Sequence, residues 1–131
     1  MEPKFSVLIP SYNDEEKIGS VLKSLIYQKK KPDQIVIADD CSKDNTINIV
    51  QEFIKINKKI DIKLIINPEN LGLYDNLKSN LKFLKYNYFF LGSANDPVYE
   101  DFFYDAYIAF SSKKSIKMFF GGFEVCYLNK I

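Results

Sequence analysis

Short apolar runs alternate along this chain with stretches of helical periodicity, and this alternation constrains the fold more than any other feature. Apolar runs typical of strands stand at 5–9, 34–38, 62–66, 88–91 and 116–120, with a further candidate at 123–128. The run 34–38 is continuously apolar after its first residue, which is typical of a strand buried on both faces of a parallel sheet. The pattern predicts an α/β fold, with a mostly parallel sheet and helices on both faces.

Four helices are predicted between these runs. The first has Glu15 and Glu16 in its first turn, where negative charge suits the helix dipole, and an apolar stripe after them. The second has Asp44 as its N-cap. The third follows the leucine repeat of 73–84, and the fourth covers 102–110. These helices supply the connections that parallel strands require.

Several classes of protein are excluded by simple counts. The chain has 131 residues, and we expect 1–131 to form a single domain. The net charge of +1 predicts no nucleic-acid partner, and the absence of histidine excludes histidine acid–base catalysis and most zinc sites. No apolar run reaches the roughly 18 to 20 residues of a membrane span, so any membrane association would be peripheral, at the inner face. Cys41 and Cys126 form no spaced pair, as expected of reduced thiols in a cytoplasmic protein.

Three predicted loops, 10–14, 39–44 and 92–97, follow strands and carry clustered Asp, Asn, Ser and Tyr residues. In a parallel sheet the ligand crevice lies outside the carboxyl ends of the strands. We therefore expect these three loops to meet in one polar site. There is no GxGxxG segment and no Walker lysine motif, so neither a dinucleotide fold nor a P-loop is supported.

The chemistry of the first two loops admits two interpretations each. Tyr12, after Pro10, could stack on a nucleobase or could simply fill its loop. Asp39 and Asp40 are adjacent carboxylates that repel each other, so they need hydrogen-bond donors or a metal nearby. Such carboxylates suit ribose hydroxyls or the imide N–H of uracil, whereas one of them could instead cap the next helix.

The third loop places the carboxylate of Asp96 beside the oxygens of Ser93 and Asn95. Such hard oxygen ligands suit Mg²⁺ or Mn²⁺ bound against phosphates, with phosphate and water completing the coordination shell. A turn with an aspartate cap is the alternative interpretation of the same residues.

Taken together, these segments resemble family 2 glycosyltransferases, which have the Rossmann-like GT-A fold. Residues 6–13 look like the family's opening strand and loop, and 37–46 are similar to its V-D-D-G-S-x-D-x-T segment. Residues 70–73 look like its N-x-G turn, and 90–96 occupy the place of its D-x-D motif, where Ser93 and Asn95 replace common carboxylates. The order and spacing of the four segments make the resemblance specific.

The resemblance implies a site for a nucleoside-diphosphate sugar, with uridine diphosphate (UDP) favoured. Tyr12 would stack on the base, Asp40 would bond its edge, and Asp96 would bind Mg²⁺ or Mn²⁺ against the diphosphate. The nucleotide-binding residues implied are Pro10, Tyr12, Asp39, Asp40, Gly72, Ser93 and Asn95. The implied reaction is transfer of the sugar, with inversion, to a hydroxyl of a glycan or lipid-linked acceptor in cell-surface polysaccharide or glycan synthesis.

The family's fold normally continues into an acceptor-binding part that supplies the catalytic base, an Asp or Glu. We expect this chain to be the truncated, donor-binding half, inactive by itself, with the base beyond Ile131. The alternative is a non-catalytic nucleotide-binding module, which the missing carboxylates of 93–96 favour. A receiver-like phosphoacceptor domain is rejected, because the paired aspartates follow the second predicted strand and no lysine ends the fifth.

Overall fold

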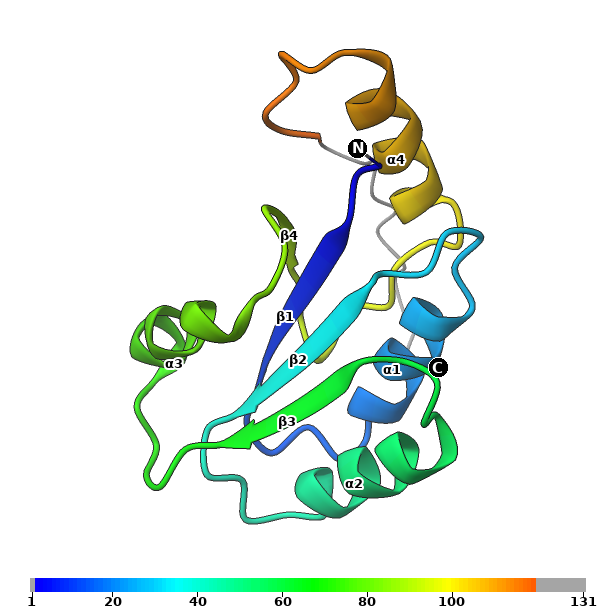
Figure 1. Cartoon of the computed structure of the whole chain (residues 1–131). Helices are drawn as coiled ribbons and strands as arrows, with labels where there is room; N and C mark the ends of the chain where they lie inside the picture. The colour runs from blue at the N-terminus through cyan, green and yellow to red at the C-terminus, as the bar shows by residue number, and fades with distance from the viewer. Residues whose placement is uncertain (1, 120–131) are drawn as a thin grey trace, which may run out of the picture.

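The computed structural model describes residues 2–119 and contains a parallel sheet of four strands in the order β3-β2-β1-β4 (Figure 1). The strands are β1 Phe5–Ser11, β2 Gln34–Asp39, β3 Ile62–Ile66 and β4 Tyr88–Leu91. The helices are α1 Ile18–Ile26, α2 Thr46–Ile56, α3 Leu73–Asn80 and α4 Phe102–Ser112. The predicted α/β class and parallel sheet are confirmed.

The sheet has an apolar layer on each face because successive side chains of a strand point to opposite sides. Val7 and Ile9 of β1 belong to the core shared with α1, α2 and α4, whereas Leu8 points to the face covered by α3 (Figure 1). All six residues of β2 are buried, as its continuous apolar run predicts. Helices therefore lie on both faces.

The first two helices begin later than predicted. Glu15 and Glu16 lie in a turn before α1, since the carbonyl of Asp14 accepts the amides of Lys17 and Ile18 at 3.0 and 2.9 Å. Their predicted place in the first helical turn is wrong. Asn45 is the residue before α2, yet Asp44 supplies the side-chain acceptor, because its Oδ1 takes the amide of Thr46 at 2.9 Å.

The leucines that predict the third helix do not share one buried face, because Leu77 and Leu84 pack against the core of this side of the sheet and the other two do not. Regular helix ends at Asn80 and a 3-10 turn, Leu81–Phe83, follows. Leu73 and Leu81 are exposed, whereas Asn76 and Asn80 are buried. Hydrogen bonding to other parts of the chain, which periodicity does not reveal, decides this orientation.

The predicted fifth strand is absent from the part of the chain that the structure describes. Residues 116–119 are not in a strand, and position 120 lies outside the described residues. The candidate strand 123–128, with Cys126, also lies outside them. Among residues 2–119, no helix is long and apolar enough to cross a membrane.

Candidate functional site

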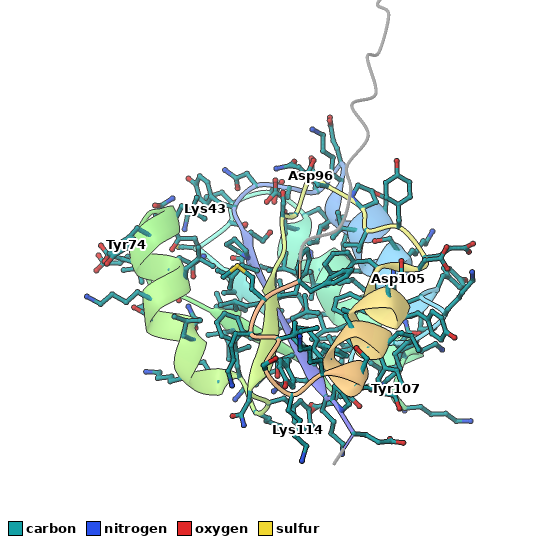
Figure 2. The ribbon with its side chains drawn as sticks, turned by 90° about the horizontal axis from the view of Figure 1, so that it is seen from above. Lys43, Tyr74, Asp96, Asp105, Tyr107 and Lys114 are labelled. Carbon is teal, nitrogen blue, oxygen red and sulfur yellow. The ribbon has the colours of Figure 1, made fainter. Side chains whose placement is uncertain are left out.

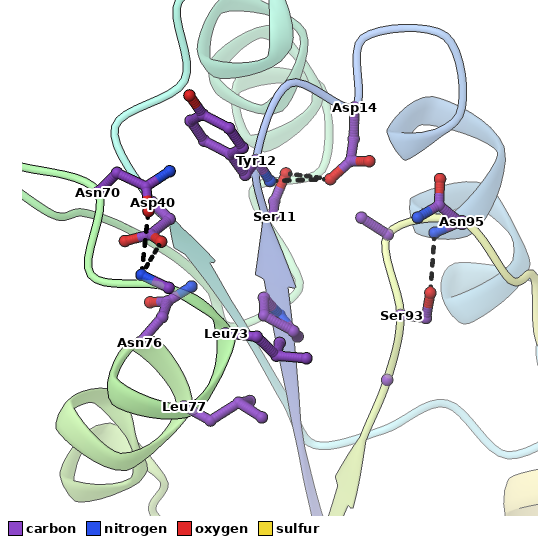
Figure 3. Close-up of a pocket in the computed structure, with 14 residues that line it drawn as sticks. Ser11, Tyr12, Asp14, Asp40, Asn70, Leu73, Asn76, Leu77, Ser93 and Asn95 are labelled. Carbon is purple, nitrogen blue, oxygen red and sulfur yellow. Dashed lines mark hydrogen bonds between the residues drawn. The ribbon is translucent and has the colours of Figure 1, made fainter.

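A cavity of about 510 Å³ opens at the carboxyl ends of the strands (Figure 3). This volume is in the range of small-molecule sites. Its lining comes from the ends of β1 and β2, from the start of α3 with the turn before it, and from the loop after β4. Six of the predicted nucleotide-binding residues line it, namely Pro10, Tyr12, Asp40, Gly72, Ser93 and Asn95. The structure thus brings the three predicted loops together.

Asp40, directly after β2, is one of the two carboxylates that line the cavity, the other being Asp14, and 3% of Asp40 is exposed. Its Oδ1 accepts the side-chain amide of Asn67 and the backbone amide of Leu71, both at 2.8 Å. Its Oδ2 accepts the amide of Gly72 at 2.9 Å. Three N–H donors therefore compensate the buried charge, and the carboxylate holds the turn before α3 against the end of β2.

Gly72 in that turn has a backbone conformation that suits glycine. Its φ is +79°, in the region that side chains with a Cβ rarely adopt. Its amide donates both to Asp40 and to the side chain of Asn70 at 3.0 Å (Figure 3). The N-x-G spacing thus places the side-chain oxygen of Asn70 beside the amide of Gly72, and Asp40 supplies a second acceptor.

Asp39 is fully buried behind the cavity and does not line it. Its Oδ1 accepts the amide of Ser42 at 2.8 Å, and its Oδ2 accepts the Ser42 hydroxyl. The two adjacent carboxylates therefore use separate sets of donors, one in the following loop and one in the turn before α3. These separate donors stabilise both carboxylates and so offset the repulsion expected between two adjacent negative charges.

Tyr12 follows β1 and lines the cavity with 46% of its surface exposed. Its amide donates to Oδ2 of Asp14 at 2.9 Å, which also accepts the hydroxyl of Ser11 at 3.2 Å (Figure 3). Because β1 and β2 pair in parallel, Tyr12 and Asp40 stand at neighbouring strand ends. An aromatic ring and a carboxylate therefore face one cavity.

Loops 11–15 and 42–46 are joined by five hydrogen bonds, which we call the loop clasp. The bonds run from Asn13 N to Ser42 Oγ (2.9 Å), Lys43 N to Asn13 Oδ1 (2.8 Å), Asp14 N to Thr46 Oγ1 (2.8 Å), Glu15 N to Asp44 Oδ2 (3.1 Å) and Asn45 N to Glu15 Oε2 (2.8 Å). Asn13 has a φ of 54° and Cys41 a φ of 67°, both in the left-handed region. The clasp fixes the loop that carries Tyr12.

Asp44 is the charged member of the clasp. Burial raises the pKa of its carboxyl, but hydrogen bonds from the hydroxyl and amide of Thr46 and from the amide of Glu15 outweigh burial. The pKa is therefore lower than its ordinary value. The ionised form is the one that the clasp binds.

The loop after β4 contributes Ser93 and Asn95 to the cavity wall, but not Asp96. The hydroxyl of Ser93 accepts the amide of Asn95 at 3.1 Å. Asp96 is exposed, and Figure 2 shows it on the side of the molecule opposite Lys114. No cluster of three or more His, Cys, Asp or Glu residues within 2–119 could hold a metal ion. A cation at Asp96 would need further oxygens, such as those of a diphosphate.

Sequence reasoning missed three buried asparagines near Asp40. Asn67 donates to Asp40, Asn76 lines the cavity, and Asn80 bonds to Asn76. The available signal was the i, i+4 spacing of two asparagines in the third helix, which places them on one face.

A parallel sheet with a cavity at the carboxyl ends of its strands is the arrangement of ligand-binding α/β domains. The family model described as glycosyl transferase family 2 matches residues 6–110. The chain belongs to this family.

Relatives and solved structures agree with this assignment. The chain is 42% identical over 85 residues to an uncharacterized protein of Methanocaldococcus jannaschii, a match that covers 62% of the chain and 35% of that protein. It is 43% identical over 71 residues to the poly(ribitol-phosphate) β-N-acetylglucosaminyltransferase TarS of Staphylococcus aureus, covering 53% of the chain and 12% of TarS. The chain thus spans about a third or less of these relatives.

Among solved structures, TarS 1–349 in complex with UDP-GlcNAc aligns with a TM-score of 0.75 and 29% identity, covering 83% of the chain and 31% of that structure. A mannosyltransferase of Pyrobaculum calidifontis, in complex with GDP-Man and Mn²⁺, aligns with a TM-score of 0.76 and 21% identity, covering 83% of the chain and 33% of that structure. The fold is therefore the GT-A fold that the sequence predicted.

Proposed function

We propose that this chain is the donor-binding part of an inverting glycosyltransferase that binds a nucleoside-diphosphate sugar, with UDP favoured. The observation that carries the proposal is the cavity in which Tyr12 and Asp40 stand at neighbouring strand ends. Solved structures of TarS with UDP-GlcNAc and with UDP support the choice of base. The acceptor proposed is a hydroxyl of a glycan or of a lipid-linked glycan.

The base is held by stacking and by one charged hydrogen bond. The half-exposed ring of Tyr12 presents an apolar face, and a base of any kind can stack on such a face. Oδ2 of Asp40 accepts one hydrogen bond within the protein, and a carboxylate oxygen has room for a second. We assign that position to the imide N–H of uracil.

Residues Ser93, Asn95 and Asp96 face the diphosphate in this proposal. The exposed carboxylate of Asp96 is a hard oxygen ligand for Mg²⁺ or Mn²⁺, provided that diphosphate oxygens complete the coordination shell. Such an ion, when bound, stabilises the charge of the leaving diphosphate. Cation and diphosphate should therefore bind together far better than either binds alone.

Sugar transfer also needs a base to remove the acceptor proton. We place this Asp or Glu outside residues 1–131, in the acceptor-binding part of the family fold. We therefore expect the chain to bind nucleotide and, by itself, to transfer no sugar.

A non-catalytic nucleotide-binding module is the second candidate. The observation that favours it is the replacement of carboxylates by Ser93 and Asn95, together with the lack of a metal-binding cluster in the described part of the chain. Donor hydrolysis or transfer by a protein that includes this chain would decide for the enzyme.

The test is calorimetric titration of the chain with UDP and with guanosine diphosphate, with and without Mn²⁺. Base stacking contributes about 1–3 kcal/mol, so Tyr12→Ala should weaken UDP binding roughly 5- to 150-fold, and Tyr12→Phe should retain most of it. Tyr27→Ala is the matched control, because Tyr27 is 72% exposed and does not line the cavity. Equal losses in Tyr12→Phe and Tyr12→Ala would contradict stacking, and absence of UDP binding would refute the proposal.

A further inference from the structure

Three asparagines at the nucleotide cavity are buried, and one of them, Asn76, lines it. Asn67 follows β3 and is 6% exposed, while Asn76 and Asn80 of α3 are 1% and 2% exposed. A buried amide without hydrogen-bond partners costs about 1–3 kcal/mol, so polar residues in such positions need a full set of partners.

Their amide groups form a connected chain of hydrogen bonds. The bonds run from Asn67 Nδ2 to Asp40 Oδ1 (2.8 Å) and to Asn76 Oδ1 (2.8 Å), from Asn76 Nδ2 to the carbonyl of Ala38 (2.9 Å), and from Asn80 Nδ2 to the carbonyl and Oδ1 of Asn76 (2.8 and 2.9 Å) and to Asn67 Oδ1 (3.4 Å). This series of hydrogen bonds joins the ends of β2 and β3 to α3. It ends on Asp40, the carboxylate that lines the cavity.

Asn67 is the link between the other asparagines and Asp40. Its Nδ2 has two hydrogens, and both are used, one on Asp40 and one on Asn76. Its backbone amide also donates to the carbonyl of Asp39 at 2.8 Å, so both its backbone and its side chain are fixed to the end of β2. Asn80 makes its shorter bonds to Asn76 and none to Asp40.

We propose that Asn67 is a positioning residue for nucleotide recognition, acting through Asp40. The inference rests on the proposed function of the cavity. The amides of Leu71 and Gly72 hold the carboxylate from the turn before α3, whereas Asn67 holds it from the side of β3. With donors on two sides, the carboxylate keeps one orientation and presents the remaining acceptor position of Oδ2 to the base. Without Asn67 it is held from the turn alone.

The experiment compares Asn67→Leu with Asn80→Leu. The two positions have the same residue and similar burial, but Asn80 does not contact Asp40, so Asn80→Leu controls for the loss of buried hydrogen bonds. Affinities are measured for UDP and, by competition, for adenosine diphosphate, whose base edge has no ring N–H. Asn67→Leu should lower the UDP preference about tenfold, the effect of one hydrogen bond to a charged group, whereas Asn80→Leu should preserve the preference.

A double-mutant cycle shows whether Asn67 acts through Asp40. Asn67→Leu should change UDP affinity less than about twofold when Asp40→Ala is already present. Should the leucine variant fail to fold, Asn67→Ala takes its place, because the smaller side chain leaves room for water, and the same loss is expected.

Either of two kinds of result, a missing effect or an effect that does not act through Asp40, overturns the inference while the proposed function stands. In one, Asp40→Ala weakens UDP binding and Asn67→Leu leaves it unchanged. In the other, Asn67→Leu weakens both nucleotides equally, or adds its full effect to that of Asp40→Ala. A wild-type chain that does not bind UDP overturns the proposed function and this inference with it.

Discussion

Asp40→Asn is the most informative single substitution in the cavity, because it keeps the shape of the side chain and changes only its hydrogen bonding. In the wild type, Oδ1 accepts two N–H groups and Oδ2 accepts one. An asparagine has one acceptor oxygen and an NH₂ group in place of the other. In either orientation, the NH₂ group therefore faces at least one N–H donor.

The expected loss of unfolding free energy depends on which N–H donor loses its acceptor. Gly72 is exposed, so water can replace the carboxylate there, and the NH₂ group should face that side. One disrupted hydrogen bond then costs about 1 kcal/mol of unfolding free energy, near the lower limit for an unsatisfied donor. UDP binding loses more, since the same NH₂ group replaces the proposed acceptor of the base N–H. A hydrogen bond to a charged group is worth about 1.5–3 kcal/mol, so UDP affinity should fall roughly 10- to 150-fold.

The assay combines urea unfolding with calorimetric titration of UDP. Asp75→Asn is the control, because Asp75 is exposed in the first turn of α3 and does not line the cavity. It should change the affinity less than about twofold, as a surface substitution does. If Asp40→Asn bound UDP as tightly as the wild type, the carboxylate would not be the recognition acceptor, and the assignment of Asp40 would be refuted.

Three further predictions follow from the loops. Asp96→Ala should abolish the Mn²⁺ dependence of UDP binding and leave metal-free binding unchanged; calorimetry that still shows the dependence would contradict the role of Asp96. Asn13→Ala should be less stable than Asn13→Gly by about 1 kcal/mol in urea unfolding, because both lose the bond from Lys43 but only alanine is strained at a φ of 54°; equal stabilities would show that the backbone is unstrained. The pKa of Asp44 is lowered in the folded protein, so its carboxylate stabilises the fold above the ordinary aspartate pKa of about 4, and this stabilisation is lost as pH falls through the lower folded pKa. Asp44→Asn should therefore flatten the dependence of the urea midpoint on pH in this range. An unchanged slope would contradict the role of Asp44.

Sequence reasoning alone located the four strands of the sheet and the edge at which the cavity opens. The bounds of β3 and β4 match the predicted runs 62–66 and 88–91, because turn residues, Asn67 and Pro68 after one run and Gly92 after the other, end each apolar run. The loops meet as predicted because parallel strands bring their carboxyl ends to one edge of the sheet. For this reason residues as distant as Tyr12 and Asn95 could be assigned to one cavity.

The tertiary structure decided which polar groups are buried and what they bind. Asp39 and Asp40 were both predicted to bind nucleotide, yet Asp39 lies behind the cavity and Asp40 lines it. Likewise, α3 buries Asn76 and Asn80, whereas Leu73 at its first position is exposed. The spacing of apolar residues predicts which side of a helix is hydrophobic. It does not predict a buried polar side chain, because such a side chain is stabilised by partners elsewhere in the chain. Asn67 is 27 residues from Asp40 in sequence, and only the folded sheet brings the two side chains to 2.8 Å.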